Sequence, residues 1–294
     1  MVDTGTFSAA AAELGYTQSA VSQQVAGLER AVGERLFDRP GGPHHVRLTP
    51  IGEVLVGHAR VIVARLQAAA ADVAAVQAGD KGSLRVGTMQ SVGTKILPRL
   101  LRRYREEHPG IALVPQEIWD LSELAAAVED GRFDLSFAPL PLPEGPFAVR
   151  RVLDDPYVLL VPADAPEAGN ESVTLRAVAR LPLIGYTDPH EFEDLLHHLR
   201  RTGADPSFVF RSNDNPTIQG FVAAGLGYAV MPRLTVDEDD PEVSVVPTVT
   251  GLPPRNLAVV WHADRQLSPA ATRFIELAVE VCADLGRGWA SDSG

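Results

Sequence analysis

Cysteine is almost absent from this chain, which carries a single one, Cys282, in 294 residues. One thiol cannot form an internal disulfide, and Cys282 stands in an apolar periodic stretch, which predicts a buried side chain. No apolar run is long enough to cross a bilayer, and the N-terminus has neither the cationic start nor the apolar centre of a secretory signal. We therefore expect a cytoplasmic location and no membrane partner.

Positive charge is also scarce. The chain has 26 Lys and Arg against 38 Asp and Glu, a net charge of −12, whereas proteins that bind nucleic acid normally present a basic surface. Residues 1–50 hold four arginines and five acidic residues, so this segment is close to neutral and most of the acidity lies elsewhere. The charge argues against a nucleic-acid partner for the chain as a whole but leaves one open for its first fifty residues.

Apolar residues, in contrast, are plentiful. They make up 45% of the chain and are spread along nearly its whole length, which argues against wholesale disorder. A chain of 294 residues exceeds the usual range of one domain, so we expect two or three globular units.

The spacing of apolar residues predicts two short helices, at residues 6–14 and 18–32, joined by a turn at Gly15. Thr17 is the expected N-cap of the second helix, and Gly33 follows its end. The side of this helix opposite its apolar residues carries short polar side chains that can reach base edges and phosphates in a major groove. These are Gln18, Ser19, Ser22 and Gln23. An ordinary amphipathic pair shows the same spacing, so periodicity alone favours packing over DNA reading.

Residues 36–49 predict a two-stranded β-ribbon with its turn at residues 40–43, which would form a wing beside the helices. Arg39 and Arg47 stand on the two arms, where a guanidinium can hold a phosphate. Taken singly, each is more typical of a solvated surface charge.

A long helix is predicted from residue 51 to about residue 78, with no glycine or proline after Gly57. Its apolar residues alternate steps of four and three, the pattern of a helix that packs along one seam against another. Packing onto its own domain is the alternative, but the length and regularity of the seam favour a partner helix.

Beyond a linker at residues 79–82, strands alternate with helices, which predicts parallel sheets. We expect strands at residues 84–87, 111–114, 133–137, 157–161, 183–186, 207–211, 228–231 and 257–261. Helices are expected after a loop at residues 88–93, up to about residue 107, and at residues 122–130, 191–202, 216–224 and 269–285.

Several stretches resemble the signature of LysR-type transcriptional regulators almost residue for residue. They are TFSAAAAEL (6–14), TQSAVSQQV (17–25), GERLFDR (33–39), LTPIG (48–52), LRVG (84–87), GRFDL (131–135) and AGLGYAVMP (224–232). The resemblance covers essentially the whole chain. It implies a winged helix-turn-helix, a linker helix that pairs two subunits and a remainder folded like periplasmic solute-binding proteins.

The fold class that the resemblance implies is α/β, with three parts. A winged helix-turn-helix would occupy residues 1–50, a dimerisation helix residues 51–79 and a two-lobed effector-binding domain residues 82–288. Lobe I would comprise about 82–160 and 263–288, and lobe II about 161–262. Expected partners are double-stranded DNA, a small-molecule effector, further copies of the chain in a dimer or tetramer, and RNA polymerase. The residues expected to contact DNA are Thr17, Gln18, Ser19, Ser22 and Gln23, with Arg39 and Arg47 on the phosphate backbone.

The start of the chain departs from the family pattern. Members usually carry another helix, of about fifteen to twenty residues, before the segment that begins here at residue 2. That helix completes the core beneath the recognition helix. We therefore expect a misassigned start or a shortened variant, with the apolar faces of the two remaining helices partly exposed.

Ligands of two-lobed α/β sensors lie between the lobes at the carboxyl ends of strands, where loops and helix N-termini supply donors. The candidate effector contacts are Thr88, Gln90, Ser91 and Trp119 from one lobe, and Tyr186, Asp188, Asn215 and Thr217 from the other. Most of them taken alone are simply helix caps or turn formers. Their convergence in the resembling fold favours binding for Ser91 and Thr217, and suggests a small polar or anionic metabolite.

Two other classes of protein are disfavoured. For an enzyme, Ser91 lacks the G-x-S-x-G turn, and the paired Glu193 with His197 and Asp194 with His198 have metal-ligand spacing but no evident third ligand. A solvated helix face explains these pairs better, so we expect no catalytic residue, no metal and no cofactor. A periplasmic solute-binding protein is disfavoured by the first eighty residues and by the lack of an export signal.

Overall fold

The structure is a computed structural model that describes residues 2, 4–38, 46–78, 82–187 and 189–291. It divides into two compact units, Met1–Ala70 and Ala71–Gly294, and each is described by itself. Among the described residues, no helix combines the length and the apolar character that a membrane span needs.

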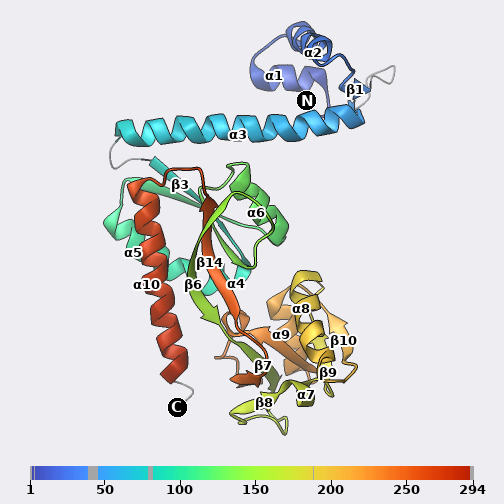
Figure 1. Ribbon diagram of the computed structural model, residues 1–294, viewed down its shortest axis with the longest axis vertical. Helices are drawn as coiled ribbons and strands as arrows, with labels where there is room; N and C mark the ends of the chain where they lie inside the picture. The colour runs from blue at the N-terminus through green and yellow to red at the C-terminus, as the bar shows by residue number, and fades with distance from the viewer. Residues whose placement is uncertain (1, 3, 39–45, 79–81, 188, 292–294) are drawn as a thin grey trace. The chain divides into compact units, whose positions relative to one another are not determined.

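The first unit begins with the two predicted helices, α1 (Phe7–Leu14) and α2 (Gln18–Val32) (Figure 1). The Thr6 and Thr17 hydroxyls cap them by accepting hydrogen bonds from the amides of Ala9 and Ala20. Gly15 ends α1 and Gly33 ends α2, both with positive φ, a conformation that glycine adopts without strain. Both helices and the Thr17 cap are confirmed.

The predicted ribbon is also present. Strand β1 (Phe37–Asp38) pairs antiparallel with β2 (Arg47–Leu48), and the Phe37 ring meets the Phe7 ring edge to face at 6.1 Å between centroids. The expected turn at residues 40–43 lies outside the described residues. Helix α3 (Pro50–Ala78) follows β2, as the seam predicts.

Apolar side chains on α1 and α2, and Tyr16 between them, are exposed, and we expected this exposure for the apolar faces of the two helices. Leu14 and Tyr16 have 62% and 57% of their surface accessible, and Leu28 has 47%. Only Val21 of α2 is fully buried. The apolar faces of the two helices are therefore only partly covered.

Lobe I is built on a five-stranded sheet in the order β4-β3-β5-β14-β6. Its strands are β3 (Gly82–Thr88), β4 (Ile111–Glu117), β5 (Leu135–Leu140), β6 (Phe147–Asp155) and β14 (Arg255–His262). Its helices are α4 (Gln90–Lys95), α5 (Leu97–Glu107), α6 (Leu121–Glu129) and α10 (Pro269–Ser291). Helices α5 and α10 pack together on one side of this lobe (Figure 1).

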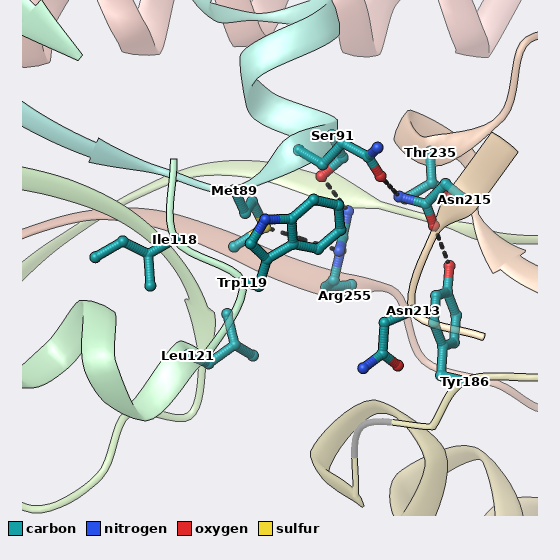
Figure 2. Close-up of a pocket in the computed structure, with 11 residues that line it drawn as sticks. Met89, Ser91, Ile118, Trp119, Leu121, Tyr186, Asn213, Asn215, Thr235 and Arg255 are labelled. Carbon is teal, nitrogen blue, oxygen red and sulfur yellow. Dashed lines mark hydrogen bonds between the residues drawn. The ribbon is translucent and has the colours of Figure 1, made fainter. Parts of the chain in front are cut away.

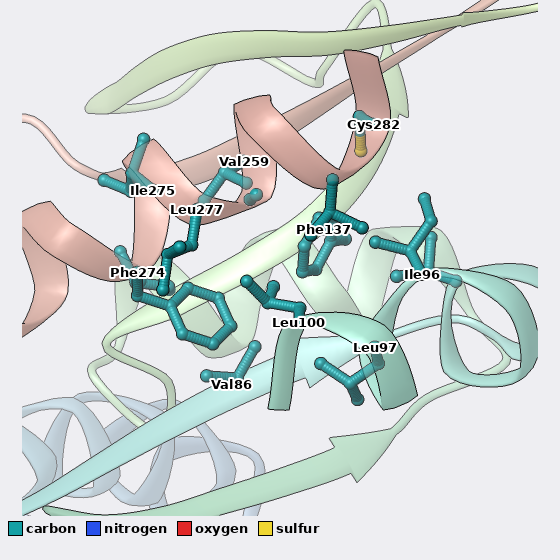
Figure 3. Packing of buried hydrophobic residues seen from close by; sticks show 14 of the residues in the cluster. Val86, Ile96, Leu97, Leu100, Phe137, Val259, Phe274, Ile275, Leu277 and Cys282 are labelled. Carbon is teal, nitrogen blue, oxygen red and sulfur yellow. The ribbon is translucent and has the colours of Figure 1, made fainter. Parts of the chain in front are cut away.

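The core of lobe I lies between this helix pair and the sheet (Figure 3). The Phe274 ring of α10 meets the rings of Tyr104 and Phe137 edge to face, at 5.4 and 6.4 Å between centroids. Cys282 lies in the same core, which confirms the predicted burial, and burial raises the pKa of its thiol to about 12.

Lobe II has a second five-stranded sheet, in the order β10-β9-β11-β7-β12. Its strands are β7 (Tyr157–Pro162), β9 (Pro182–Gly185), β10 (Ser207–Arg211), β11 (Tyr228–Pro232) and β12 (Val243–Val246). Two short strands, β8 (Ser172–Thr174) and β13 (Thr248–Thr250), form a separate pair. Helices α7 (Leu175–Val178), α8 (Pro189–Arg200) and α9 (Asn215–Ala223) and a 3₁₀ turn (Arg233–Thr235) complete the lobe.

Three expectations need correction. The sheets are mixed rather than parallel, because β14 runs antiparallel to β5 and β6, and β7 runs antiparallel to β11 and β12. Strand β14 belongs to lobe I, so the expected limit of lobe II at residue 262 is too late.

Strands β6, β8, β12 and β13 were not predicted. The chain crosses between the lobes twice, before β7 and before β14, and a strand that returns from the other lobe gives no local signal of the sheet it enters.

Candidate functional site

A cavity of about 60 Å³ lies between the two lobes (Figure 2). Lobe I lines it with the start of α4 and the segment before α6, and lobe II lines it with residues that follow β9 and β10. Both elements of lobe I and both of lobe II follow strands at their carboxyl ends, where α/β proteins bind ligands. The lining residues are Met89, Gln90, Ser91, Ile118, Trp119, Leu121, Tyr186, Asn213, Asn215, Thr235 and Arg255.

A hydrogen bond crosses this cavity from lobe to lobe. Asn215, the first residue of α9, donates from Nδ2 to Oε1 of Gln90 on α4 at 2.6 Å. Its Oδ1 accepts from the hydroxyl of Tyr186 at 2.9 Å. Asn215 therefore uses both ends of its amide, one within lobe II and one across the cleft.

A buried ion pair lies behind the cavity, where the chain passes between the lobes. The Arg255 guanidinium, at the start of β14, donates to Asp155 at the end of β6, with 2.7 Å between Nη2 and Oδ2. The same Nη2 donates to Ser91 Oγ at 3.2 Å, and Asp155 accepts from the amide of Leu234. Burial raises the pKa of Asp155, and the charge of Arg255 opposes this rise. The pair thus connects β6 and β14 to each other, and the bond from Arg255 to Ser91 connects them to α4.

Five of the eight expected effector residues line the cavity: Gln90, Ser91, Trp119, Tyr186 and Asn215. Their role in binding stays a prediction. Trp119 is 58% exposed, and the other four are buried or half-buried. Asp188 lies outside the described residues.

Thr88 and Thr217 are not among the residues that line the cavity. Thr88 is buried at the end of β3, and its hydroxyl donates to the carbonyl of Met89. The Thr217 hydroxyl donates to Asp214 Oδ2 at 2.6 Å, and its amide donates to the same oxygen, so the pair closes the N-terminus of α9. These bonds lower the pKa of Asp214. Thr217 thus takes part in the N-terminal cap of α9. A helix cap is the role that we gave as the alternative to ligand contact.

Sequence reasoning missed Arg255, the charged residue of the cavity. It follows two prolines and opens a strand, and neither feature signals a binding role. Only the pairing of β14 with β5 and β6 brings it next to Ser91.

The expected DNA-contact residues lie on the surface of the first unit. Thr17, Gln18, Ser19 and Gln23 are exposed and Ser22 is half-buried, and Ser19 and Gln23 lie opposite the buried Val21. Gln18 donates to the Ser22 hydroxyl at 3.3 Å, and the hydroxyls of Thr17 and Ser19 are 3.1 Å apart. Arg47 is exposed on β2, and Arg39 lies outside the described residues. Their contacts with DNA stay predictions.

The paired histidines of α8 form no larger group of metal-binding side chains among the residues described. His198 Nδ1 lies 2.9 Å from the backbone oxygen of Asp194 and 3.7 Å from its carboxylate. Glu193, Asp194 and His197 are exposed and His198 is half-buried, so the solvated helix face that we favoured describes three of these four residues.

Two family models match the chain. One, described as "Bacterial regulatory helix-turn-helix protein, lysR family", matches residues 1–53, and the other, "LysR substrate binding domain", matches residues 77–283. The uncharacterized HTH-type transcriptional regulator YnfL of Escherichia coli (strain K12) is 30% identical over 275 residues, 91% of each chain.

Solved structures show the same fold. A full-length OxyR variant from Pseudomonas aeruginosa is 24% identical, with a TM-score of 0.67 over 95% of this chain and 89% of that one. Full-length CbnR complexed with its target DNA is 18% identical, with a TM-score of 0.70 over 95% and 96% of the two chains.

Proposed function

The chain belongs to the LysR family of transcriptional regulators, and from this premise we propose which surfaces of it read DNA and sense the effector. The exposed side of α2 reads base edges in a major groove. An effector lodges in the cavity between lobes I and II, and its binding changes promoter activity. The observation that carries the first part is the polar, exposed face of α2 opposite Val21.

The start of α2 is suited to duplex DNA for two reasons. Amide and hydroxyl side chains can donate to and accept from base edges, and they gather here within two helical turns. The backbone amides of a helix N-terminus also attract phosphate. Arg47 on the wing supplies a cation for the DNA backbone, where contacts position a protein without reading sequence.

The cavity is suited to a switch because bonds from both lobes meet in it. An effector that contacts Gln90 and Asn215 competes with, or extends, the bond that these side chains make to each other. The free energy of effector binding therefore differs between an open and a closed arrangement of the two lobes, as a conformational switch requires.

Helix α3 is the proposed dimerisation element. Its 29 residues make a rod of about 43 Å. Ile62 and Leu66 of the predicted seam are 59% and 66% exposed, which is costly for large apolar side chains unless another surface covers them. We propose a dimer or tetramer in the cytoplasm that acts on RNA polymerase at its promoters. Since the relatives are transcriptional regulators, no catalytic role is proposed.

A gel shift with the duplex immediately upstream of the chain's own coding region tests DNA binding. A scrambled duplex of equal length is the control. The candidate effectors are the metabolites on which the products of neighbouring genes act. We expect a retarded complex with the native duplex and a change in it with one metabolite. Binding no stronger than to the scrambled duplex would refute the proposal.

The exposed Trp119 gives a direct test of the cavity. A ligand there changes the surroundings of this indole, so its fluorescence should titrate with the effector. The Trp119→Phe variant, which keeps Trp261 and Trp289, should lose that signal. A titration that is unchanged in the variant would place the ligand elsewhere.

A further inference from the structure

A second and much larger pocket opens on the cleft between the lobes. Its volume is about 570 Å³, within the range of roughly 300 to 1,000 Å³ that is usual for small-molecule sites. Five prolines contribute to its wall, Pro139, Pro141, Pro143, Pro253 and Pro254, and we call it the proline pocket. The cavity of about 60 Å³ described above has room only for a small polar group or a few waters.

The two spaces adjoin each other. Leu121 and Arg255 line both of them. The proline pocket also takes residues from both lobes, with Ser122 on α6 and Tyr157 at the start of β7. A molecule larger than the cavity can therefore extend past Leu121 and Arg255 into the proline pocket.

The wall of the proline pocket is apolar and poor in donors. Proline has no backbone N–H, so five positions of the wall offer no amide donor, and their rings add apolar surface. Leu140, Leu142 and Ala138 extend that surface. Asn256 is a polar exception: its Oδ1 is buried and accepts no hydrogen bond from the described residues.

The charges around both spaces disfavour an anion. Arg255 is the cation among the described residues that line them, and its charge is compensated by Asp155 at 2.7 Å. Asp194 adds a carboxylate that is 62% exposed. An anionic ligand would lose its hydration without gaining an uncompensated cation, and such desolvation costs several kcal/mol.

We propose that the effector is an uncharged molecule with a ring-sized apolar body, which fills the proline pocket, and one hydrogen-bonding end, which reaches Ser91 and Gln90 in the cavity. This inference rests on the proposed effector role of the cleft. It replaces the small polar or anionic metabolite that the residues alone suggested.

Three probes of matched chemistry test the proposal on the full chain. Benzamide has the ring and an uncharged end, benzoate has the same ring with a negative charge, and acetamide has the end without the ring. Calorimetric titration should give benzamide a Kd at least tenfold lower than those of benzoate and acetamide, since tenfold corresponds to about 1.4 kcal/mol.

Two variants locate the binding. Ser122 is exposed at the start of α6, so Ser122→Phe should block the proline pocket without disturbing the fold, and should weaken benzamide binding at least tenfold. Ala126→Phe, at an exposed position one turn further along α6, is the matched control and should bind like the parent.

The outcomes separate this inference from the proposed function. Benzoate or acetamide binding as tightly as benzamide would overturn the inference about ligand class, while a loss in Ser122→Phe would still support the cleft as the site. Benzamide binding that Ser122→Phe leaves unchanged, or no saturable binding within the solubility of benzamide, would overturn the assignment of the pocket. DNA binding is measured separately by gel shift, so a failure there refutes the regulator proposal alone.

Discussion

Asn215 of lobe II and Gln90 of lobe I are joined directly across the cleft, with 2.6 Å between Nδ2 and Oε1. Both open a helix, α9 and α4 respectively. The bond therefore connects the first turns of two helices that belong to different lobes. A hydrogen bond of this kind contributes about 0.5 to 1.5 kcal/mol, enough to change the ratio of two conformers by about two- to twelvefold.

Replacing Gln90 with leucine should loosen the effector-free cleft, because leucine keeps the volume but cannot accept from Asn215. We expect a larger mean distance between the lobes, measured by double electron–electron resonance between spin labels on α6 and α8. Thr217→Val is the matched control, since it removes a bond that stays within lobe II. Equal distance distributions in Gln90→Leu and the parent would contradict a role of this bond in closure.

The double variant Ser22→Ala with Gln23→Ala should weaken operator binding and relax its sequence preference. Contacts to base edges are worth about 1 to 3 kcal/mol each, so we expect at least a tenfold rise in Kd. Gln24→Ala removes an exposed amide from the same helix that is not among the proposed contacts, and should bind normally. A footprint of the double variant that matches the parent would remove α2 from the reading role.

Arg47→Ala should act differently from the α2 variants. A phosphate contact carries no sequence information, so affinity should fall equally for specific and unrelated duplexes. The slope of log K against log salt should decrease in magnitude by about 1. A change in sequence preference instead would show that Arg47 contacts bases.

The cavity shows what sequence patterns reveal and what they leave out. Ser91 and Asn215 could be found because each stands where a strand gives way to a helix, a local pattern. The same pattern also selected Thr217, since a helix cap and a ligand contact use the same residue types. Arg255 could not be found, because it meets Asp155 and Ser91, which are 100 and 164 positions away, only when β14 joins the sheet of lobe I.

Breaking the buried pair of Asp155 and Arg255 should destabilise the effector domain strongly. Asp155→Asn leaves a buried guanidinium without its counter-ion, and we expect a loss of about 3 kcal/mol in the free energy of unfolding, measured by urea denaturation. The neighbouring pair Asp154 and Arg151 is exposed, so Asp154→Asn should cost less than about 1 kcal/mol. The double variant Asp155→Leu with Arg255→Met should lose less than the sum of its single changes. Additive losses would mean that the two charges do not stabilise each other.

Alkaline pH should weaken lobe I through Tyr104. Burial raises the pKa of this phenol from 10.0 to about 12, so the folded state favours its neutral form. Its contribution is therefore complete below pH 10 and is lost as the pH rises towards 12, by about 1 to 2 kcal/mol. Tyr104→Phe loses the bond to the Ala270 carbonyl at neutral pH but has no phenol to titrate. The stability gap between parent and variant should consequently narrow between pH 10 and pH 12 in denaturant titrations. A gap that stays constant would show that the Tyr104 phenol ionises as readily in the folded protein as in the unfolded chain.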